Sequence, residues 1–303
     1  MVKTVRAVGA IRDSRDDRIF HVFVLIVINL LFLAVLYPMV YIVSSSFSSP
    51  GAINSGKVIL WPVEFSVDGY RAVFGNGMVG VGYLNSVFYA VAGTGINLFL
   101  TLTAAYALSC AKLPGRKFLI LMFLFTMLFG GGMIPNFILV RNLGILNTRW
   151  AMLLPGAIGI YNLIITRTFI MSSIPGELQE AAEIDGCSDI QYFWHCVIPL
   201  SKPIIAVITL FYAVDHWNSY FQAFLYLNDR TLVPLQIVLR DILIANTVDP
   251  STLMDETLMA AKLGLADLIK YALIIVSSLP VMMIYPFIQK YFIKGVMIGS
   301  LKG

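Results

Sequence analysis

The sequence predicts an all-α membrane protein with six transmembrane helices, and two observations carry this prediction. Hydrophobic residues make up 58% of the 303 residues and charged residues only 13%, whereas about 25% of the residues of soluble domains are charged. The charged residues are also grouped, so that stretches such as 83–111 and 118–140 contain no Asp, Glu, Lys or Arg. Because an apolar stretch of about 20 residues crosses a membrane as a helix, soluble enzymes, disordered chains and disulfide-rich secreted domains are excluded.

The predicted spans follow one another along the chain, separated by polar connections. Each is expected to be helical, because an open strand in lipid would leave backbone N–H and C=O groups unbonded. The first span is too long for the apolar part of a secretory signal and lacks a cleavage site. Glycines and prolines, among them Gly130 to Gly132 in the third span, are expected to interrupt several helices. The six spans cover about residues 20–44, 83–111, 118–140, 150–172, 204–226 and 268–288.

Lysine and arginine in the short flanking segments predict the orientation, because they collect on the cytoplasmic side of membrane proteins. The N-terminal tail, residues 1–19, carries five of them, and the connection 112–117 carries three. More follow the last span, in and just before the C-terminal tail 293–303. Taken together, the opposite connections mix both signs of charge. Both termini are therefore predicted inside, around a membrane domain that covers residues 20–292.

The connection between the fourth and fifth spans, residues 174–203, is longer than two neighbouring helices require. Pro175 suits the first turn of a helix, and the glutamates that follow it complement the helix dipole. Gly186 is placed to end this helix in a left-handed conformation. Ser188 or Asp189 can then cap a second short helix, with an apolar face of Ile190, Phe193, Trp194 and Val197. The connection therefore predicts two short cytoplasmic helices built to dock against another protein.

This connection resembles the EAA loop of permease subunits of binding-protein-dependent ABC importers. The loop reads Glu-Ala-Ala, three residues, glycine, a fixed gap and an apolar pair before proline, and an aspartate before the glycine is typical of the sugar importers. Cys196 and Ile198 stand where the pattern prefers isoleucine and leucine, and both are apolar. The matching residues, which the resemblance identifies as ATPase-coupling residues, are Glu180, Ala181, Ala182, Asp185, Gly186 and Pro199.

The resemblance extends over nearly the whole chain, to permeases for complex oligosaccharides, including uronate-type importers such as those for alginate and aldouronate. It rests on the glycine-rich third span, residues 216–220, the turn 227–230 and the glycine-rich C-terminus. It implies the type I importer architecture, a second homologous permease subunit, two cytoplasmic ATP-binding subunits and an extracytoplasmic solute-binding protein. ATP with magnesium would bind to those partners, and this chain would need no cofactor. The expected location is the bacterial cytoplasmic membrane, as a multi-pass protein.

The fifth span holds candidates for an oligosaccharide path. Asp215 is the acid that lies deep in an apolar span, where charge is rare and usually functional. In a continuous helix, Asp215, Asn218 and Gln222 would share one face, with aromatic residues on the neighbouring one. Alternatively, the aromatic residues pack between helices, Asp215 pairs with a sister subunit and the amides join helices. The candidates are Asp215, Trp217, Asn218, Tyr220, Gln222, Asn162 and Asn136.

Motifs for other chemistry are missing from the sequence. It contains no phosphate-binding G-x-x-x-x-G-K-[ST] loop, no nucleophile elbow, and no spacing of His or Cys typical of a metal site. Basic residues flank apolar spans and do not alternate with aromatic residues, so nucleic acid is not expected as a partner. The remaining alternative is a secondary transporter driven by an ion gradient, which would need more buried ionisable groups or an internal repeat.

Overall fold

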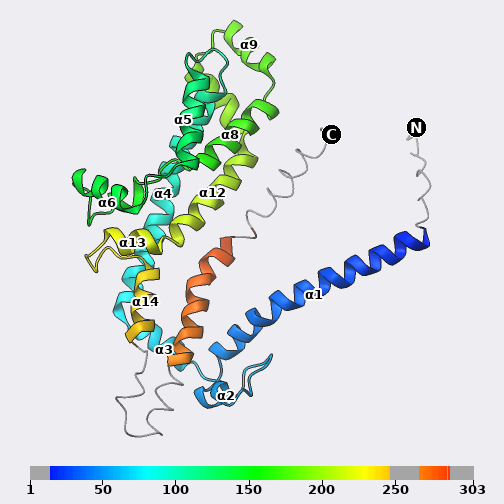
Figure 1. Ribbon diagram of the computed structural model, residues 1–303, viewed down its shortest axis with the longest axis vertical. Helices are drawn as coiled ribbons and strands as arrows, with labels where there is room; N and C mark the ends of the chain where they lie inside the picture. The colour runs from blue at the N-terminus through cyan, green and yellow to red at the C-terminus, as the bar shows by residue number, and fades with distance from the viewer. Residues whose placement is uncertain (1–13, 246–265, 285, 287–303) are drawn as a thin grey trace. The chain divides into compact units, whose positions relative to one another are not determined.

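A computed structural model describes residues 14–245, 266–284 and 286, and every regular element within them is a helix (Figure 1). Three helices in these ranges are long and apolar enough to cross a membrane: α1 (Arg15–Ser46), α4 (Gly77–Ser109) and Ala266–Ile284. The number rises to five if each of two bent helix pairs forms one span. The first, second and sixth predicted spans are thus single helices at the predicted places, and the count of six stays a prediction.

The third predicted span, 118–140, is not a straight helix. α5 (Arg116–Leu128) and α6 (Met133–Asn142) meet at 115°. Between them lie Phe129 and three glycines, and Gly132 has a φ of 84°. Glycine adopts this left-handed conformation without a steric penalty. The run of glycines therefore turns the chain sharply, where an interrupted but single span was predicted.

The fourth and fifth predicted spans are also divided. α7 (Trp150–Leu153) and α8 (Ile160–Ser173) are separated by a segment that contains Pro155 and Gly156. α8 has 14 residues, fewer than the roughly 20 that cross a hydrocarbon core of about 30 Å. In the fifth, α12 (Lys202–Trp217) ends before α13 (Tyr220–Tyr226) begins.

The chain divides into two compact units, one of Met1–Arg71 and Val248–Ile275 and the other of Ala72–Thr247 and Val276–Gly303. In the first unit, a small apolar cluster surrounds α2 (Pro50–Asn54) and Leu268. The buried residues of α1 are the three serines at its C-terminal end. An apolar helix exposed along nearly its whole length needs lipid or another protein around it. The predicted tails, 1–19 and 293–303, lie outside the described residues except for 14–19.

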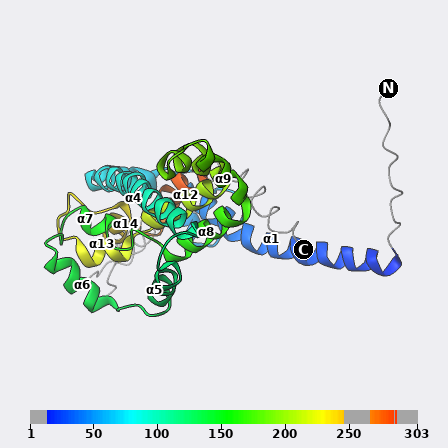
Figure 2. The ribbon, with the colours of Figure 1, turned by 90° about the horizontal axis from the view of Figure 1, so that it is seen from above.

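In the second unit, α4 is the central helix, and it packs against α8, α12 and α14 (Leu235–Ala245). Figure 2 shows α4, α8 and α12 side by side. The buried face of α4 carries several polar residues, although the helix as a whole is apolar enough to span a membrane. Its buried residues recur every three or four positions and include Asn85, Ser86, Tyr89, Gly93, Asn97 and Thr101.

Hydrogen bonds hold this polar seam of α4 to its neighbours. The side chains of Asn97 and His216 meet at 3.2 Å, and the hydroxyls of Thr101 and Tyr212 at 2.7 Å. Gly93 permits the close approach, since a Cβ at that position would lie 2.3 Å from Nε2 of His216. Interhelical hydrogen bonds and small residues are the usual means of joining helices within a membrane. They tie α4 and α12 into one body.

Connections predicted on the same side of the membrane lie together in this unit. At one end, Lys112 of the connection 112–117 contacts Glu183 of the connection 174–203, here called the acidic connection. At the other end, the side-chain oxygen of Asn147 accepts hydrogen bonds of 2.8 Å from the backbone N–H groups of Asn228 and Asp229. The end of the unit that carries α9 (Gly176–Ile184) and the end that carries α14 are far apart in Figure 1. Which of these ends faces the cytoplasm stays a prediction.

Candidate functional site

The acidic connection folds into two short helices with the local geometry that the sequence predicts. α9 (Gly176–Ile184) follows Pro175, which occupies the N-cap position. Gly186 comes two residues after α9 and has a φ of 76°. Ser188 then caps α10 (Asp189–Tyr192) through a reciprocal capping box. Both turns follow from local backbone preferences, because glycine favours the left-handed region and serine favours N-caps.

α9 is an exposed helix. None of its residues is buried, and the side chain of Ile184 at its end is 87% exposed. Of the predicted coupling residues, Glu180, Ala181, Asp185, Gly186 and Pro199 are exposed, and Ala182 is half-buried against the core. The surface of α9 is therefore open to contact with another protein.

An ion pair connects α9 to the connection 112–117. The ammonium of Lys112 lies 2.6 Å and 2.8 Å from the two carboxylate oxygens of Glu183. This hydrogen-bonded contact lowers the pKa of the Glu183 carboxyl and raises the pKa of the Lys112 ammonium. Because both side chains are well exposed, the pair adds little to stability. It joins α9 to the end of α4 through the connection 112–117.

The segment after α10 is anchored in the core of the unit. It forms a π-helical turn, Phe193–Val197, and then the short helix α11 (Ile198–Leu200). Tyr192, Phe193 and Val197 are buried in the cluster that contains Leu102 and Ala105 of α4. The chain then bends by 81° into α12, at Ser201 between Pro199 and Pro203. A displacement of α9 would therefore be passed to α4 and α12.

The apolar face predicted for this segment is wrong in part. Phe193 and Val197 are buried, but Ile190 is 73% and Trp194 52% exposed, and Tyr192 is buried instead. Ile190 and Tyr192 lie on α10, whereas Trp194 lies in the π-helical turn that begins at Phe193, in which hydrogen bonds span five residues and not four. A face deduced from the α-helical period of 3.6 residues therefore shifts along this turn.

The candidates for a substrate path are spread over four helices, α6, α8, α12 and α13. Asp215 and Asn218, at the end of α12, are both exposed. The break at Asn218 and Ser219 separates them from Gln222, which lies half-buried on α13. The prediction of one face for Asp215, Asn218 and Gln222 is therefore wrong, because it assumed a continuous helix.

The other candidates have packing contacts or lie apart from Asp215. Trp217 is buried, donates its indole N–H to the carbonyl of Ser277 at 2.9 Å and meets the ring of Tyr83 edge-on. Tyr220 stacks on Phe224, with the ring centroids 6.0 Å apart. The two remaining amides lie elsewhere, the buried Asn162 on α8 and the exposed Asn136 on α6. The interpretation as helix packing thus describes Trp217 better than a path does.

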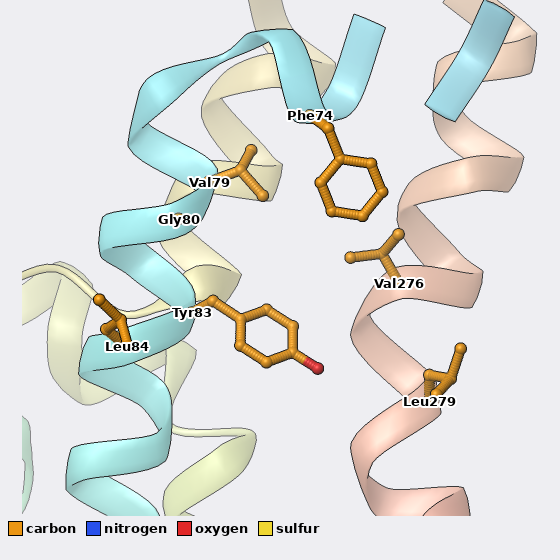
Figure 3. A pocket seen from close by; sticks show the side chains of 7 residues that line it. All are labelled: Phe74, Val79, Gly80, Tyr83, Leu84, Val276 and Leu279. Atoms are coloured by element: carbon orange, nitrogen blue, oxygen red, sulfur yellow. The ribbon is translucent and has the colours of Figure 1, made fainter. Parts of the chain in front are cut away.

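A hollow of about 480 Å³ lies between the start of α4 and the C-terminal helix (Figure 3). The rings of Phe74 and Tyr83 point into it from one side, and Val276 and Leu279 from the other. Its side chains offer one polar group, the hydroxyl of Tyr83. A sugar needs several hydrogen-bonding partners for its hydroxyls, so this hollow does not suit an oligosaccharide.

Sequence reasoning missed the polar seam of α4 as a functional element. The signal was present, because Asn85, Tyr89, Gly93, Asn97 and Thr101 recur every four residues within an apolar span. Their partners, such as Tyr212 and His216, lie more than a hundred positions away in the chain, where no local pattern can indicate them.

Comparisons with known proteins identify the family, although no family model matches the chain. The chain is 42% identical over 287 residues to the polygalacturonan/rhamnogalacturonan transport system permease protein YtcP of Bacillus subtilis, covering 95% of this chain and 99% of that protein. It is 40% identical over 301 residues to protein LplC of the same organism, covering 98% and 99%.

A solved structure is similar over the same extent. It is a chain from the crystal structure of a bacterial ABC transporter involved in the import of the acidic polysaccharide alginate, with a TM-score of 0.83 and 36% identity. The match covers 92% of this chain and 99% of that one. The resemblance to permease subunits of ABC importers is thus confirmed. The chain belongs to the permease subunits of ABC transport systems for sugars and oligosaccharides.

Proposed function

We propose that this protein is the membrane permease subunit of an ATP-driven importer that carries oligosaccharides across the bacterial cytoplasmic membrane. The observation that carries the proposal is α9, an exposed helix with an apolar tip whose flanking segments are fastened to the membrane helices. The complete transporter would contain a second homologous permease, two cytoplasmic ATP-binding subunits that hold ATP and magnesium, and an extracytoplasmic solute-binding protein. This chain contributes the path and the coupling, not the hydrolysis.

The contacts of α9 suggest how coupling works. When two ATP-binding subunits close, each draws its α9 along. Lys112 passes this displacement to the connection at the end of α4, and the buried segment after α10 passes it to α4 and α8. After the bend at Ser201 the chain enters α12. The hydrogen bonds Asn97–His216 and Thr101–Tyr212 join α12 to α4. α4, α8 and α12 then move as one body, and the side of the membrane on which the path opens changes.

The proposed cargo is an acidic oligosaccharide. Two relatives support this choice by name, one as a permease for polygalacturonan and rhamnogalacturonan and the other as a transporter for the acidic polysaccharide alginate. Asp215 and Asn218 are the predicted path residues that lie next to each other and are both exposed. The amide of Asn218 would bind sugar hydroxyls. The carboxylate of Asp215 would also bind hydroxyls, but it would repel the carboxylates of an acidic cargo.

Asp215→Asn is expected to raise the ratio of acidic to neutral oligosaccharide import, because it removes a repulsive charge and a strong acceptor for hydroxyls. Assembly should not change, since Asp215 is exposed and pairs with no lysine or arginine in the part of the chain that the structure describes. Initial uptake rates for matched acidic and neutral trisaccharides measure the ratio. Loss of the complex would show instead that Asp215 pairs with a sister subunit.

Reversing the charge of Lys112 or of Glu183 is expected to lower sugar-stimulated ATP hydrolysis roughly two- to fivefold, and exchanging both charges to restore it. Glu183 with its lowered pKa loses the contact only as pH falls below the ordinary value of 4.5, and Lys112 with its raised pKa only as pH rises above 10.5. Between these limits the contribution of the pair should not vary with pH. A double exchange no better than either single change would argue against this contact.

Reconstitution in liposomes tests the proposed function as a whole. The purified complex, with its binding protein outside and ATP inside, should accumulate oligosaccharides, and uptake should require ATP. A panel of neutral and acidic chains of equal length identifies the cargo class. Uptake that persists without ATP but stops when an ionophore collapses the ion gradients would instead establish a secondary transporter.

A further inference from the structure

A hollow of about 730 Å³ lies at the beginning of α5, close to the connection that carries Lys112. Three basic side chains line it, those of Arg116, Lys117 and Arg167. The apolar side chains of Leu113, Phe118 and Ile120 complete its wall. The basic residues come from two segments that are far apart in the sequence, so the fold itself brings them together.

In the part of the chain that the structure describes, no carboxylate pairs with these three cations. No acidic residue lines the hollow, and none of the three cations forms an ion pair within the ranges that the structure describes. Arg167 donates from Nε to the carbonyl of Leu108 at 2.9 Å, and Arg116 contacts the sulfur of Met171 at 3.3 Å. The nearby acid Glu183 is already bound by Lys112. Like charges gathered without a counter-charge favour the binding of an anion.

The hollow continues into an exposed apolar surface. α5 has no buried residue, and Phe118, Leu121 and Phe125 are 70%, 66% and 57% exposed. Together they offer an apolar surface that begins at the cations and follows the helix. A free anion would use the cations alone, whereas a ligand with a charged head and a hydrocarbon tail would cover both parts.

The predicted orientation places this hollow at the cytoplasmic surface of the membrane, where anionic lipids are found and basic pockets between helices bind their headgroups. We propose that it is a binding site for an anionic phospholipid. Arg116, Lys117 and Arg167 would hold the phosphate, and an acyl chain would lie along α5. Because the same connection bears Lys112, a bound lipid would also steady the segment that contacts α9.

Native mass spectrometry tests this site on the full-length protein, purified together with its partner subunits. Phosphatidylglycerol and phosphatidylcholine with identical acyl chains are added in parallel, and glycerol 3-phosphate serves as the free headgroup. We expect phosphatidylglycerol to bind more tightly than phosphatidylcholine. Changing Arg116, Lys117 and Arg167 together to Gln should remove this preference. The affinity for phosphatidylglycerol should fall roughly 100-fold, since each basic residue contributes about 1 kcal/mol.

Two further variants keep the test decisive. Lys57→Gln, Arg71→Gln and Arg141→Gln together remove the same charge on the predicted outer side and should keep the lipid preference. If the triple pocket variant does not fold, Arg116→Gln with Lys117→Gln leaves the bond of Arg167 intact and should still weaken phosphatidylglycerol binding. The proposal fails if the pocket and control variants bind this lipid equally, or if glycerol 3-phosphate binds as tightly as the lipid.

Discussion

Ile184→Asp is expected to separate the permease from its ATP-binding subunits while leaving the permease itself folded. The side chain of Ile184 is 87% exposed at the end of α9, so the permease loses no internal contact. In the proposed complex it is buried, and burying an isoleucine contributes about 1.5–3 kcal/mol, or roughly a 10- to 100-fold change in affinity. A buried, unpaired carboxylate adds to this loss. Co-purification and ATP-dependent uptake should both fall to background.

Two controls make the result specific to α9. Ile184→Leu keeps an apolar side chain of similar volume and should retain uptake. Ile59→Asp places the same charge at another exposed isoleucine, 60% exposed and on the predicted outer side, and should leave the ATP-binding subunits attached. If Ile184→Asp co-purifies with these subunits as the unchanged protein does, α9 is not the docking helix.

Gly186→Leu is expected to leave the protein inserted in the membrane but to uncouple hydrolysis from transport. Gly186 has a φ of 76°, and a Cβ added there would meet no atom within 4 Å. Within the permease the expected effect therefore arises in the backbone, where the left-handed conformation costs a residue with a side chain about 1–2 kcal/mol. The fraction of molecules in which this turn has another shape would be roughly 5- to 30-fold larger than in the unchanged protein. Oligosaccharide-stimulated ATP hydrolysis and uptake measure the loss.

Gly176→Leu is the matched control for this change. Gly176 begins the same helix and is also surrounded by open space, but its φ is not positive. The same added side chain should therefore be tolerated, and hydrolysis should stay coupled to uptake. Equal defects in the two variants would indicate that bulk at the docking surface, and not the turn at Gly186, causes the loss.

Some elements of the fold could be predicted because their cause is local. α1, α4 and the C-terminal helix follow from long uncharged apolar stretches, which have few alternatives in a membrane. The turn at Gly186 and the cap at Ser188 follow from the preferences of single residues for particular backbone conformations. These features needed no knowledge of distant neighbours.

Other elements could not be predicted, since the deciding contacts join distant parts of the chain. The π-helical turn at Phe193 exposes Trp194, and the break after Trp217 separates Asp215 from Gln222. Composition predicts how apolar a span is, but it does not state where the helix breaks or which face meets a neighbour. The buried residues at these places contact distant parts of the chain, as Phe193 does α4 and Trp217 does Ser277. Such contacts cannot be read from a window of adjacent residues.

By itself, the sequence determined that this protein lies in a membrane, belongs to the ABC permeases and carries an acidic helix–turn–helix between two spans. Local hydrophobicity and backbone preference are properties of short segments, so a short segment is enough to reveal them. The tertiary structure alone decided that a polar seam joins α4 to α12, that Lys112 holds α9 and that three cations meet beside α5. Each of these depends on residues that only folding brings within a few ångströms of one another.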